Sequence, residues 1–260
     1  MMSRIGLALG SGGARGFAHI GVLEILEEHG IRPAFLAGSS MGSLVASLYA
    51  CGFTPSMMEK LAVHLKRKHW LDLCVPGMGF VVGEKLRHIV ELLTRGKNIE
   101  ELDRPLSIVA ADLISGERVV FTEGPVYEAV RASVSIPGIF VPHKIGNRLL
   151  VDGGVVDRVP IELVRSMGAD LTIGVDVSLA PSGSPIRSLF DVIFQTIDVM
   201  EREIFRHRTV NADIMIRPDV GRFSSTSFTN VAQIIEEGRK AARLMIPHIQ
   251  EKIEEWRKQA

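Results

Sequence analysis

The sequence predicts one α/β domain, a three-layer α/β/α sandwich with a mainly parallel central sheet. In the first 52 residues, short apolar runs that end near glycine alternate with segments whose apolar residues recur at helical spacing. Such alternation is typical of parallel strands joined by crossover helices. The chain has 260 residues, 46% of them hydrophobic, which suffices for one large core, and no linker divides residues 1–260.

The first two strand–helix pairs are the clearest. Ile5 to Leu9 is a short apolar run closed by glycine, as in a buried strand. Residues 14–29 follow with helical spacing, and Gly30 suits a helix C-terminus. Ala34 to Ala37 predicts a second strand, and residues 41–51 predict a helix of small residues. This order implies that the two strands are parallel.

The later elements follow the same reasoning with weaker patterns. The strands at 140–150 are expected to be short and irregular, because proline and glycine interrupt them. The C-terminal helix is expected to pack back on the domain. Helices are predicted at 54–68, 83–94, 125–133, 160–167, 186–207 and 230–257, strands at 106–112, 117–122, 171–176 and 212–216, and loops at 180–185 and 218–229.

Charge and cysteine content exclude several classes of protein. Thirty Lys and Arg residues balance thirty Asp and Glu residues, so no net charge draws the chain to nucleic acid. Two cysteines are too few for a disulfide framework, and the first apolar run is too short for a signal peptide. No run reaches the roughly 18 apolar residues of a membrane span. We expect a cytoplasmic protein, with peripheral contact to the inner membrane face where a local patch provides it.

The stretch Gly38-Ser39-Ser40-Met41-Gly42 has the G-x-S-x-G spacing of a nucleophilic serine. A serine hydroxyl is a weak nucleophile until a neighbouring base takes its proton. A tight strand-to-helix turn exposes the hydroxyl, and Gly38 and Gly42 remove side chains that would clash there. Ser40 is therefore the candidate nucleophile; the alternative is a packing turn without chemistry.

The glycine loop, residues 10–16, joins the first strand to the first helix, so its free N–H groups point at whatever lies there. It lacks the third glycine of G-x-G-x-x-G and the Gly-Lys-Ser/Thr of a Walker loop, which argues against a nucleotide. We favour an oxyanion hole. The amides of Gly12, Gly13 and Ala14 would face the substrate, and Arg15 would add positive charge or brace the loop.

Val151-Asp152-Gly153-Gly154 offers a carboxylate followed by two glycines. Such a turn can approach another backbone turn closely, and Asp152 can then hydrogen-bond the hydroxyl of Ser40. An Asp-Gly turn on its own, however, is ordinary and carries no chemistry.

Together these motifs resemble the patatin-like phospholipases, specifically their compact bacterial branch, over about residues 4–216. The resemblance implies a catalytic dyad of Ser40 and Asp152, an oxyanion hole in the glycine loop, and calcium-independent hydrolysis of acyl esters without a cofactor. Ser11 departs from the pattern, because many members have glycine there. The matching stretches are Gly10–Leu23 (GSGGARGFAHIGVL), Gly38–Gly42 (GSSMG), Ser133–Pro142 (SVSIPGIFVP) and Asp152–Gly154.

A histidine-containing triad is the rival mechanism. The chain order Ser, Asp, His would nominate His207 or His248, but both lie in predicted long helices. His19 is expected to be a packed or hydrogen-bonding residue.

No metal site is expected, because the chain has no Cys/His pair or HExxH helix. Asp198, Glu201 and Glu203 are interpreted as a solvated helix face.

The segment from Lys66 to Val82 begins with basic residues and continues as an apolar run from Trp70, broken by proline and glycine. An exposed Trp beside basic residues suits an anionic membrane surface or the mouth of a substrate site. The alternative is a helix end satisfied by lysines, with the apolar segment packed on the core.

The helix at 186–207 is apolar on more than one face, so it is buried in the core, against a lid or at a homodimer interface.

These observations predict a lipid acyl hydrolase of phospholipase A, lysophospholipase or esterase type, acting on a phospholipid or another acyl ester. Two alternatives stay open. One is a thioesterase or acyltransferase that uses the same serine, and the other is a non-catalytic lipid-binding regulatory protein.

Overall fold

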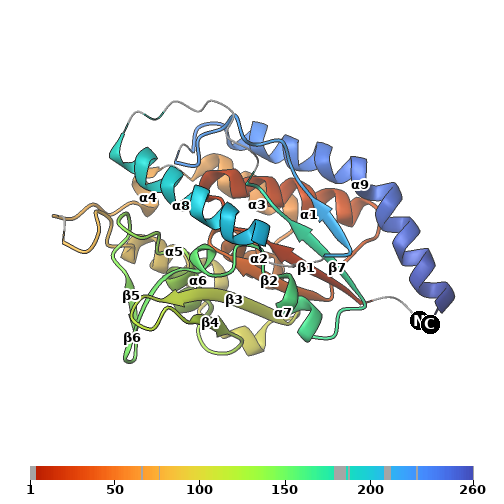
Figure 1. Cartoon of the computed structure of the whole chain (residues 1–260), viewed down its shortest axis with the longest axis horizontal. Coiled ribbons are helices and arrows are strands. Elements are labelled where there is room, and N and C mark those ends of the chain that lie inside the picture. The colour runs from red at the N-terminus through yellow and green to blue at the C-terminus, as the bar shows by residue number, and fades with distance from the viewer. Residues whose placement is uncertain are drawn as a thin grey trace.

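The computed structural model describes residues 4–65, 67–75, 77–178, 186, 188–207, 212–226 and 228–259. Lys66 and the predicted loop at 180–185 lie outside these residues. The described chain builds an eight-stranded sheet with helices on both sides (Figure 1), which confirms the predicted three-layer α/β class. The strands are β1 (Ile5–Leu9), β2 (Phe35–Ser39), β3 (Leu106–Asp112), β4 (Arg118–Phe121), β5 (His143–Ile145), β6 (Arg148–Asp152), β7 (Leu171–Val175) and β8 (Ile214–Ile216).

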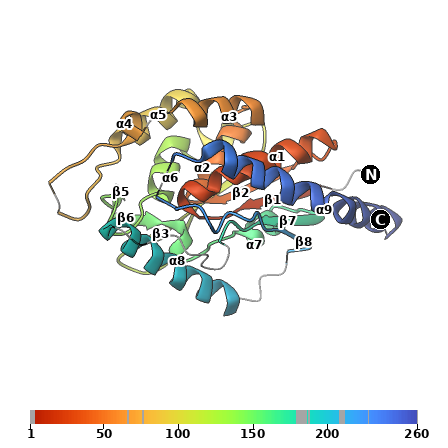
Figure 2. The same cartoon turned by 90° about the horizontal axis from the view of Figure 1, so that it is seen from above.

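The helices form two layers of unequal size. Figure 2 shows α7 and α8 on one side of the sheet and most other helices on the opposite side. The predicted helix at 54–68 is divided in two, because α3 ends at His64. The helices are α1 (Ala18–Glu28), α2 (Met41–Ala50), α3 (Pro55–His64), α4 (Arg67–Trp70), α5 (Glu84–Thr94), α6 (Val126–Ser133), α7 (Ile161–Ser166), α8 (Leu189–His207) and α9 (Val231–Gln259), with short 3₁₀ turns η1 (Gly13–Phe17), η2 (Ile99–Glu101) and η3 (Gly153–Val155).

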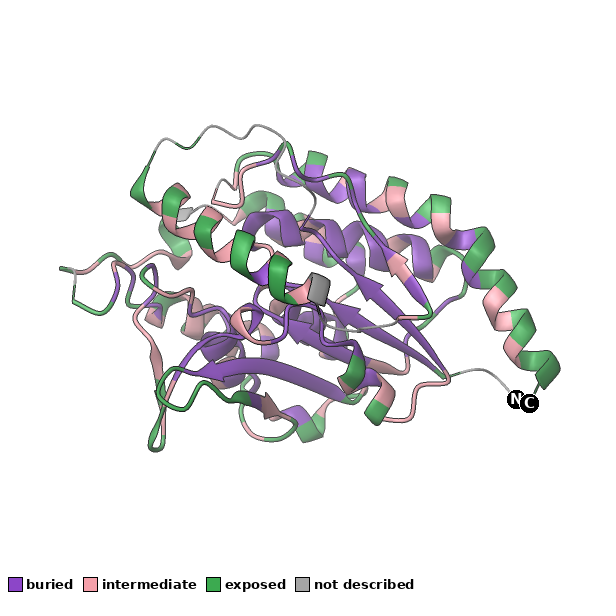
Figure 3. Ribbon diagram, in the orientation of Figure 1, coloured by how far each residue is buried: buried purple, intermediate pink, exposed green. Residues whose placement is uncertain are grey.

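The central strand β1 shows how the sequence sets these layers. Ile5, Leu7 and Leu9 point to the large helical layer and belong to the main core, whereas Ala8 points to the α7 side. On that side Gly6 brings the strand close to α7, since a Cβ there would lie 2.7 Å from Cβ of Val164. Figure 3 shows the central strands of the resulting sheet, β1, β2, β3 and β7, as almost wholly buried. A strand covered on both faces is apolar at successive positions, as the sequence of β1 is.

The C-terminal helix α9 packs along α1, at the upper right of Figure 1. The backbones approach closely at two glycines. A Cβ at Gly21 would lie 2.0 Å from the Ile235 carbonyl oxygen, and one at Gly238 would lie 2.0 Å from that of Ala18. Larger side chains would force the helices apart at both points. The helix continues through Pro247 to Gln259, slightly beyond the predicted end.

The pairing of β3 brings two distant segments together. Strand β2 pairs with β3 in parallel up to Val109, and β6 pairs with it in antiparallel fashion from Ala110 onward. Since β4 pairs opposite residues 108–111, β2 and β6 must occupy the same edge of β3, end to end. The last residue of β2, Ser39, and the last residue of β6, Asp152, therefore meet. The segment at 140–150, expected to be irregular, forms the hairpin β5–β6 that makes this possible.

In the part of the chain that the structure describes, no helix combines the length and the apolar character needed to span a bilayer.

Candidate active site

Ser40 occupies a strained turn between β2 and α2. Its backbone has φ +54° and ψ −126°, a region that non-glycine residues rarely adopt, and its side chain is buried. The flanking glycines of the predicted elbow are required by close contacts. A Cβ at Gly42 would lie 2.1 Å from the Leu9 carbonyl oxygen, and one at Gly38 would lie 2.6 Å from that of Gly42. Such strain is typical of a turn that presents a functional hydroxyl.

The hydroxyl of Ser40 donates a hydrogen bond of 2.5 Å to Oδ2 of Asp152. The other carboxylate oxygen accepts the Gly154 amide at 2.8 Å, and the Asp152 amide donates to the Ser135 carbonyl at 2.9 Å. On the other side, the Ser40 amide donates to Oγ of Ser133 at 2.9 Å. Neighbouring groups thus hold both Ser40 and Asp152 in place, and the two side chains have the arrangement of a nucleophile with its base.

Gly153 lets the Asp152 turn approach the sheet. A Cβ at this position would lie 2.2 Å from the carbonyl oxygen of Val109. Val109 belongs to β3, the strand with which both β2 and β6 pair. A Cβ at Gly154 would lie 2.5 Å from Oε1 of Glu201. The two glycines therefore permit the close approach that the sequence motif suggested.

Burial raises the pKa of Asp152 above its ordinary value, and the negative charge of Glu201 raises it further. The hydrogen bonds from Ser40 and Gly154 and the charge of Arg158 oppose the shift. A carboxylate with a raised pKa is a better proton acceptor than a solvated one, because a general base works best near the operating pH.

Two amides of the glycine loop lie beside this site without a backbone acceptor among the described residues. They belong to Gly12 and Gly13, and both residues line a small cavity shared with Ser40 and Asp152. The amide of Ala14 instead donates to the Ser225 carbonyl at 2.8 Å, so it is not offered to a substrate. This differs from the three-amide hole that the sequence suggested.

Arg15 braces the glycine loop from behind. Its side chain is buried, and Nε donates to the Phe223 carbonyl at 2.8 Å. Nη2 donates to the Gly221 carbonyl at 3.4 Å, and Nη1 lies 3.7 Å from Oδ2 of Asp198. Of the two roles considered for Arg15, the contacts favour bracing.

Helix α8 faces the site with carboxylates, contrary to the interpretation of Asp198 and Glu201 as solvated; only Glu203 is exposed. Oε2 of Glu201 accepts hydrogen bonds of 2.7 Å from both Ser11 Oγ and Arg158 Nη1. Arg158 also bonds Asp198 through Nη2 at 2.8 Å. The helix turns inward because buried Arg158 and the Ser11 hydroxyl need partners, a long-range requirement that its apolar periodicity does not reveal.

Neutralising Glu201 is expected to alter the pH dependence of any reaction in which Asp152 is the base. A carboxyl group must be ionised to accept a proton, so such a reaction slows as pH drops through the pKa of Asp152. Glu201→Gln removes a nearby negative charge that raises this pKa, and the acidic limb of the kcat/KM profile should move to lower pH. The profile is measured with a soluble ester. Exposed Glu203→Gln is the matched control, and an unmoved limb in Glu201→Gln would contradict the expectation.

Neither of the two histidines nominated for a triad is seen beside Ser40 and Asp152 among the described side chains. His248 lies exposed on α9, 3.4 Å from Glu251, and the side chain of His207 lies outside the description. His19 is buried, and its Nε2 donates to the Gly10 carbonyl at 2.8 Å, while burial lowers its pKa to about 4. His19 therefore stays neutral and supports the glycine loop, as expected. Among the described residues, no group of three or more His, Cys, Asp or Glu is placed to hold a metal.

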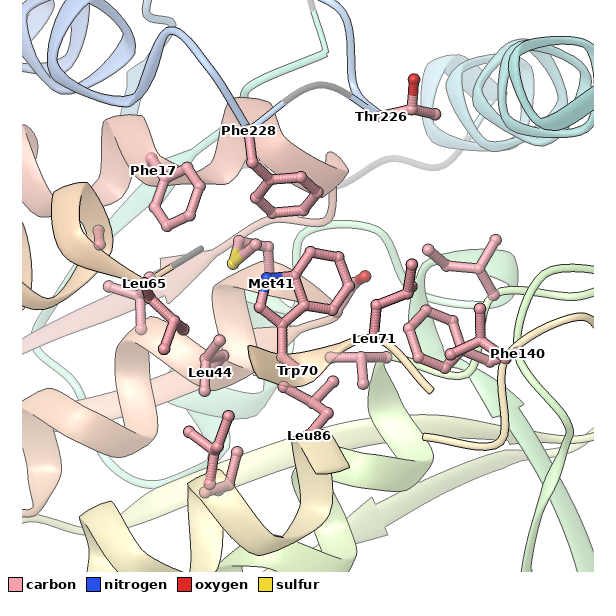
Figure 4. A pocket seen from close by; sticks show the side chains of 18 of the residues that line it. Phe17, Met41, Leu44, Leu65, Trp70, Leu71, Leu86, Phe140, Thr226 and Phe228 are labelled. Carbon is pink, nitrogen blue, oxygen red and sulfur yellow. The ribbon is translucent and has the colours of Figure 1, made fainter. Parts of the chain in front are cut away.

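Ser40 lines a large apolar cavity. Its volume is about 540 Å³, within the roughly 300–1,000 Å³ typical of sites that enclose small ligands. Figure 4 shows aromatic and aliphatic side chains lining it, including Phe17, Trp70 and Phe228. Of the two readings of the segment from Trp70, exposed or packed, Trp70 itself follows the second: it is half-buried against Phe228, with ring centroids 4.7 Å apart. The lining suits a hydrocarbon chain better than a polar ligand.

Comparison with known proteins places these features in a family context. The family model described as patatin-like phospholipase matches residues 7–165. An uncharacterized NTE family protein of Mycobacterium tuberculosis is 39% identical over 187 residues, which are 69% of this chain and 51% of that protein. Patatin-like phospholipase domain-containing protein 6 of Homo sapiens is 35% identical over 66% of this chain and 13% of its own length. The chain thus spans about half the first relative and far less of the second.

Solved structures share the fold. VipD from Legionella pneumophila superposes with a TM-score of 0.69 at 15% identity, covering 95% of this chain and 67% of VipD. The type III effector protein ExoU gives a TM-score of 0.55 at 14% identity, over 97% of this chain and 54% of ExoU.

Proposed function

This chain belongs to the patatin-like phospholipase family, and we propose that it is a lipid acyl hydrolase with Ser40 as nucleophile and Asp152 as base. One observation carries the proposal: Ser40, which donates the 2.5 Å hydrogen bond to Asp152, also lines an apolar cavity of about 540 Å³. A reactive hydroxyl beside a hydrocarbon-lined space is what hydrolysis of an acyl ester needs.

The reaction follows from the positions of these groups. Ser40 Oγ attacks the ester carbonyl carbon and gives its proton to Asp152 Oδ2, while the amides of Gly12 and Gly13 donate to the oxygen that becomes negative. The tetrahedral intermediate collapses, and the leaving alcohol takes the proton from Asp152. Water then attacks the acyl-enzyme and gives a proton to Asp152, which returns it to Ser40 as the fatty acid leaves.

The substrate is proposed to be a phospholipid or another acyl ester with one long chain in the cavity. Both the proton acceptor and the oxyanion donors are groups of the protein, so the reaction is proposed to need no calcium. Such a protein would act in the cytoplasm, on lipid at the inner membrane face.

Turnover of a panel of defined phospholipids, lysophospholipids and monoacyl esters tests the proposal. We expect fatty acid release that persists in excess chelator and labelling of Ser40 by a fluorophosphonate probe. Absence of labelling together with lipid binding would favour the regulatory alternative. Product that appears only when an acceptor alcohol or thiol is added would favour an acyltransferase. Loss of activity on chelation would contradict the metal-free mechanism.

A further inference from the structure

The loop between α4 and α5 holds apolar side chains in solvent. Leu73, Val75 and Met78 are 70%, 91% and 62% exposed. Figures 1 and 2 both show this loop extending beyond the rest of the chain. The run from Trp70 to Val82 is therefore divided: Trp70 is half-buried and Val81 is buried, whereas Leu73, Val75 and Met78 face water.

The start of α8 adds to the same surface. Leu189 and Val192 of this helix are 59% and 47% exposed. The rings of Phe80 and Phe190 meet edge to face at 5.2 Å between centroids, so the loop and the first turn of α8 adjoin. We call Leu73, Val75, Met78, Leu189 and Val192 the docking surface.

The loop is held in its projecting position. The Cys74 amide donates to the Phe80 carbonyl at 3.0 Å, and the Val82 amide donates to the Asp72 carbonyl at 2.9 Å. Nη2 of the buried Arg131 donates to the carbonyl of Val82 at 2.5 Å. A hydrogen-bonded stem with a cationic anchor keeps the apolar tip away from the core instead of letting it collapse inward.

The docking surface is continuous with the cavity. Leu71 and Val81, at the two ends of the loop, line the cavity, and so does Phe190 of α8. Basic side chains stand at the base: Lys68 is exposed, and Lys85 lies with Nζ 3.4 Å from the Leu71 carbonyl oxygen. Asp72 and Glu84 also stand at the base, where Asp72 accepts the Gly83 and Lys85 amides and Glu84 pairs with Arg87. Apolar side chains above exposed lysines suit the surface of an anionic bilayer.

Resting on the proposed function, we propose that the docking surface inserts into a bilayer containing anionic phospholipid and that an acyl chain passes from there into the cavity. A second copy of the chain fits the surface less well. Stable protein interfaces bury roughly 800 Å² per partner, and a narrow projecting tip offers little flat area. Lipid, by contrast, closes around a convex apolar tip.

Vesicle binding by the Ser40→Ala protein tests the proposal without hydrolysis. The vesicles contain phosphatidylcholine and phosphatidylglycerol, and bound protein is measured by sedimentation. Adding Val75→Asp and Met78→Asp should weaken binding at least about tenfold, because charged side chains resist insertion. Leu244→Asp is the matched control: the exposure of Leu244, 81%, lies between those of Met78 and Val75, but Leu244 is on α9, and its replacement should leave binding unchanged.

The protein that keeps its native Ser40 supplies a second readout, the turnover of lipid. Val75→Asp with Met78→Asp should reduce turnover of vesicle lipid at least about tenfold and leave turnover of a soluble short-chain ester unchanged, since neither side chain lines the cavity. Equal vesicle binding with and without the two substitutions, or an equal loss with Leu244→Asp, would overturn the proposal. So would a wild-type dimer in lipid-free sedimentation that the substitutions convert to monomer.

The two proposals fail separately. Binding that depends on Val75 and Met78 in a protein that hydrolyses no ester would support docking and refute the hydrolase. Hydrolysis of soluble esters without vesicle binding would refute docking alone.

Discussion

Alanine in place of Ser40 is expected to lower kcat/KM for lipid and soluble esters by about 10⁴-fold or more. The reason is that the substitution removes the oxygen that forms the covalent bond, and its hydrogen bond to Asp152 disappears with it. Labelling by a fluorophosphonate probe should disappear as well. Both losses are measured on protein whose thermal unfolding matches the wild type.

The neighbouring serine provides the control. Ser39 is also buried, and its Oγ has no hydrogen-bond partner in the described chain. Ser39→Ala should therefore leave turnover within a few-fold of wild type, as substitutions that break no interaction usually do. Wild-type turnover in Ser40→Ala, or loss of turnover in Ser39→Ala alone, would show that Ser40 is not the nucleophile.

Asn in place of Asp152 should lower kcat about 10³–10⁴-fold, as removal of a base that a nucleophile depends on does in other serine hydrolases. The amide keeps the shape of the carboxylate but cannot accept the proton of Ser40. Turnover of a soluble ester measures the effect, and lipid binding should be retained. A variant with near wild-type kcat would rule out Asp152 as the base.

The same substitution should not destabilise the protein at neutral pH. Because the pKa of Asp152 is raised on folding, the folded state binds more protons than the unfolded chain as pH rises above the ordinary carboxyl pKa, so stability declines across that window. Asn lacks this penalty, and its Tm should equal or exceed that of the wild type. Asp112→Asn is the matched control. Asp112 is also a buried carboxylate, which accepts the Ile114 amide at 3.0 Å, and replacing it should leave kcat unchanged.

Much of the architecture followed from local patterns. The strand of Ile5 to Leu9, the elbow around Ser40 and the glycine loop are short stretches whose conformation depends on neighbours in the chain. Apolar runs, helical spacing and tight glycine turns report such conformations directly. The boundaries of most helices and strands accordingly lie within a few residues of those predicted.

The sequence by itself determined which turns exist and which hydroxyl one of them presents. Only the tertiary structure decided that Asp152 lies 2.5 Å from that hydroxyl, that the Ala14 amide is taken by Ser225, and that Glu201 turns inward to Ser11. These contacts join residues from 112 to 211 positions apart. They depend on which strands share an edge of β3 and on how buried charges find partners, and no local periodicity encodes either.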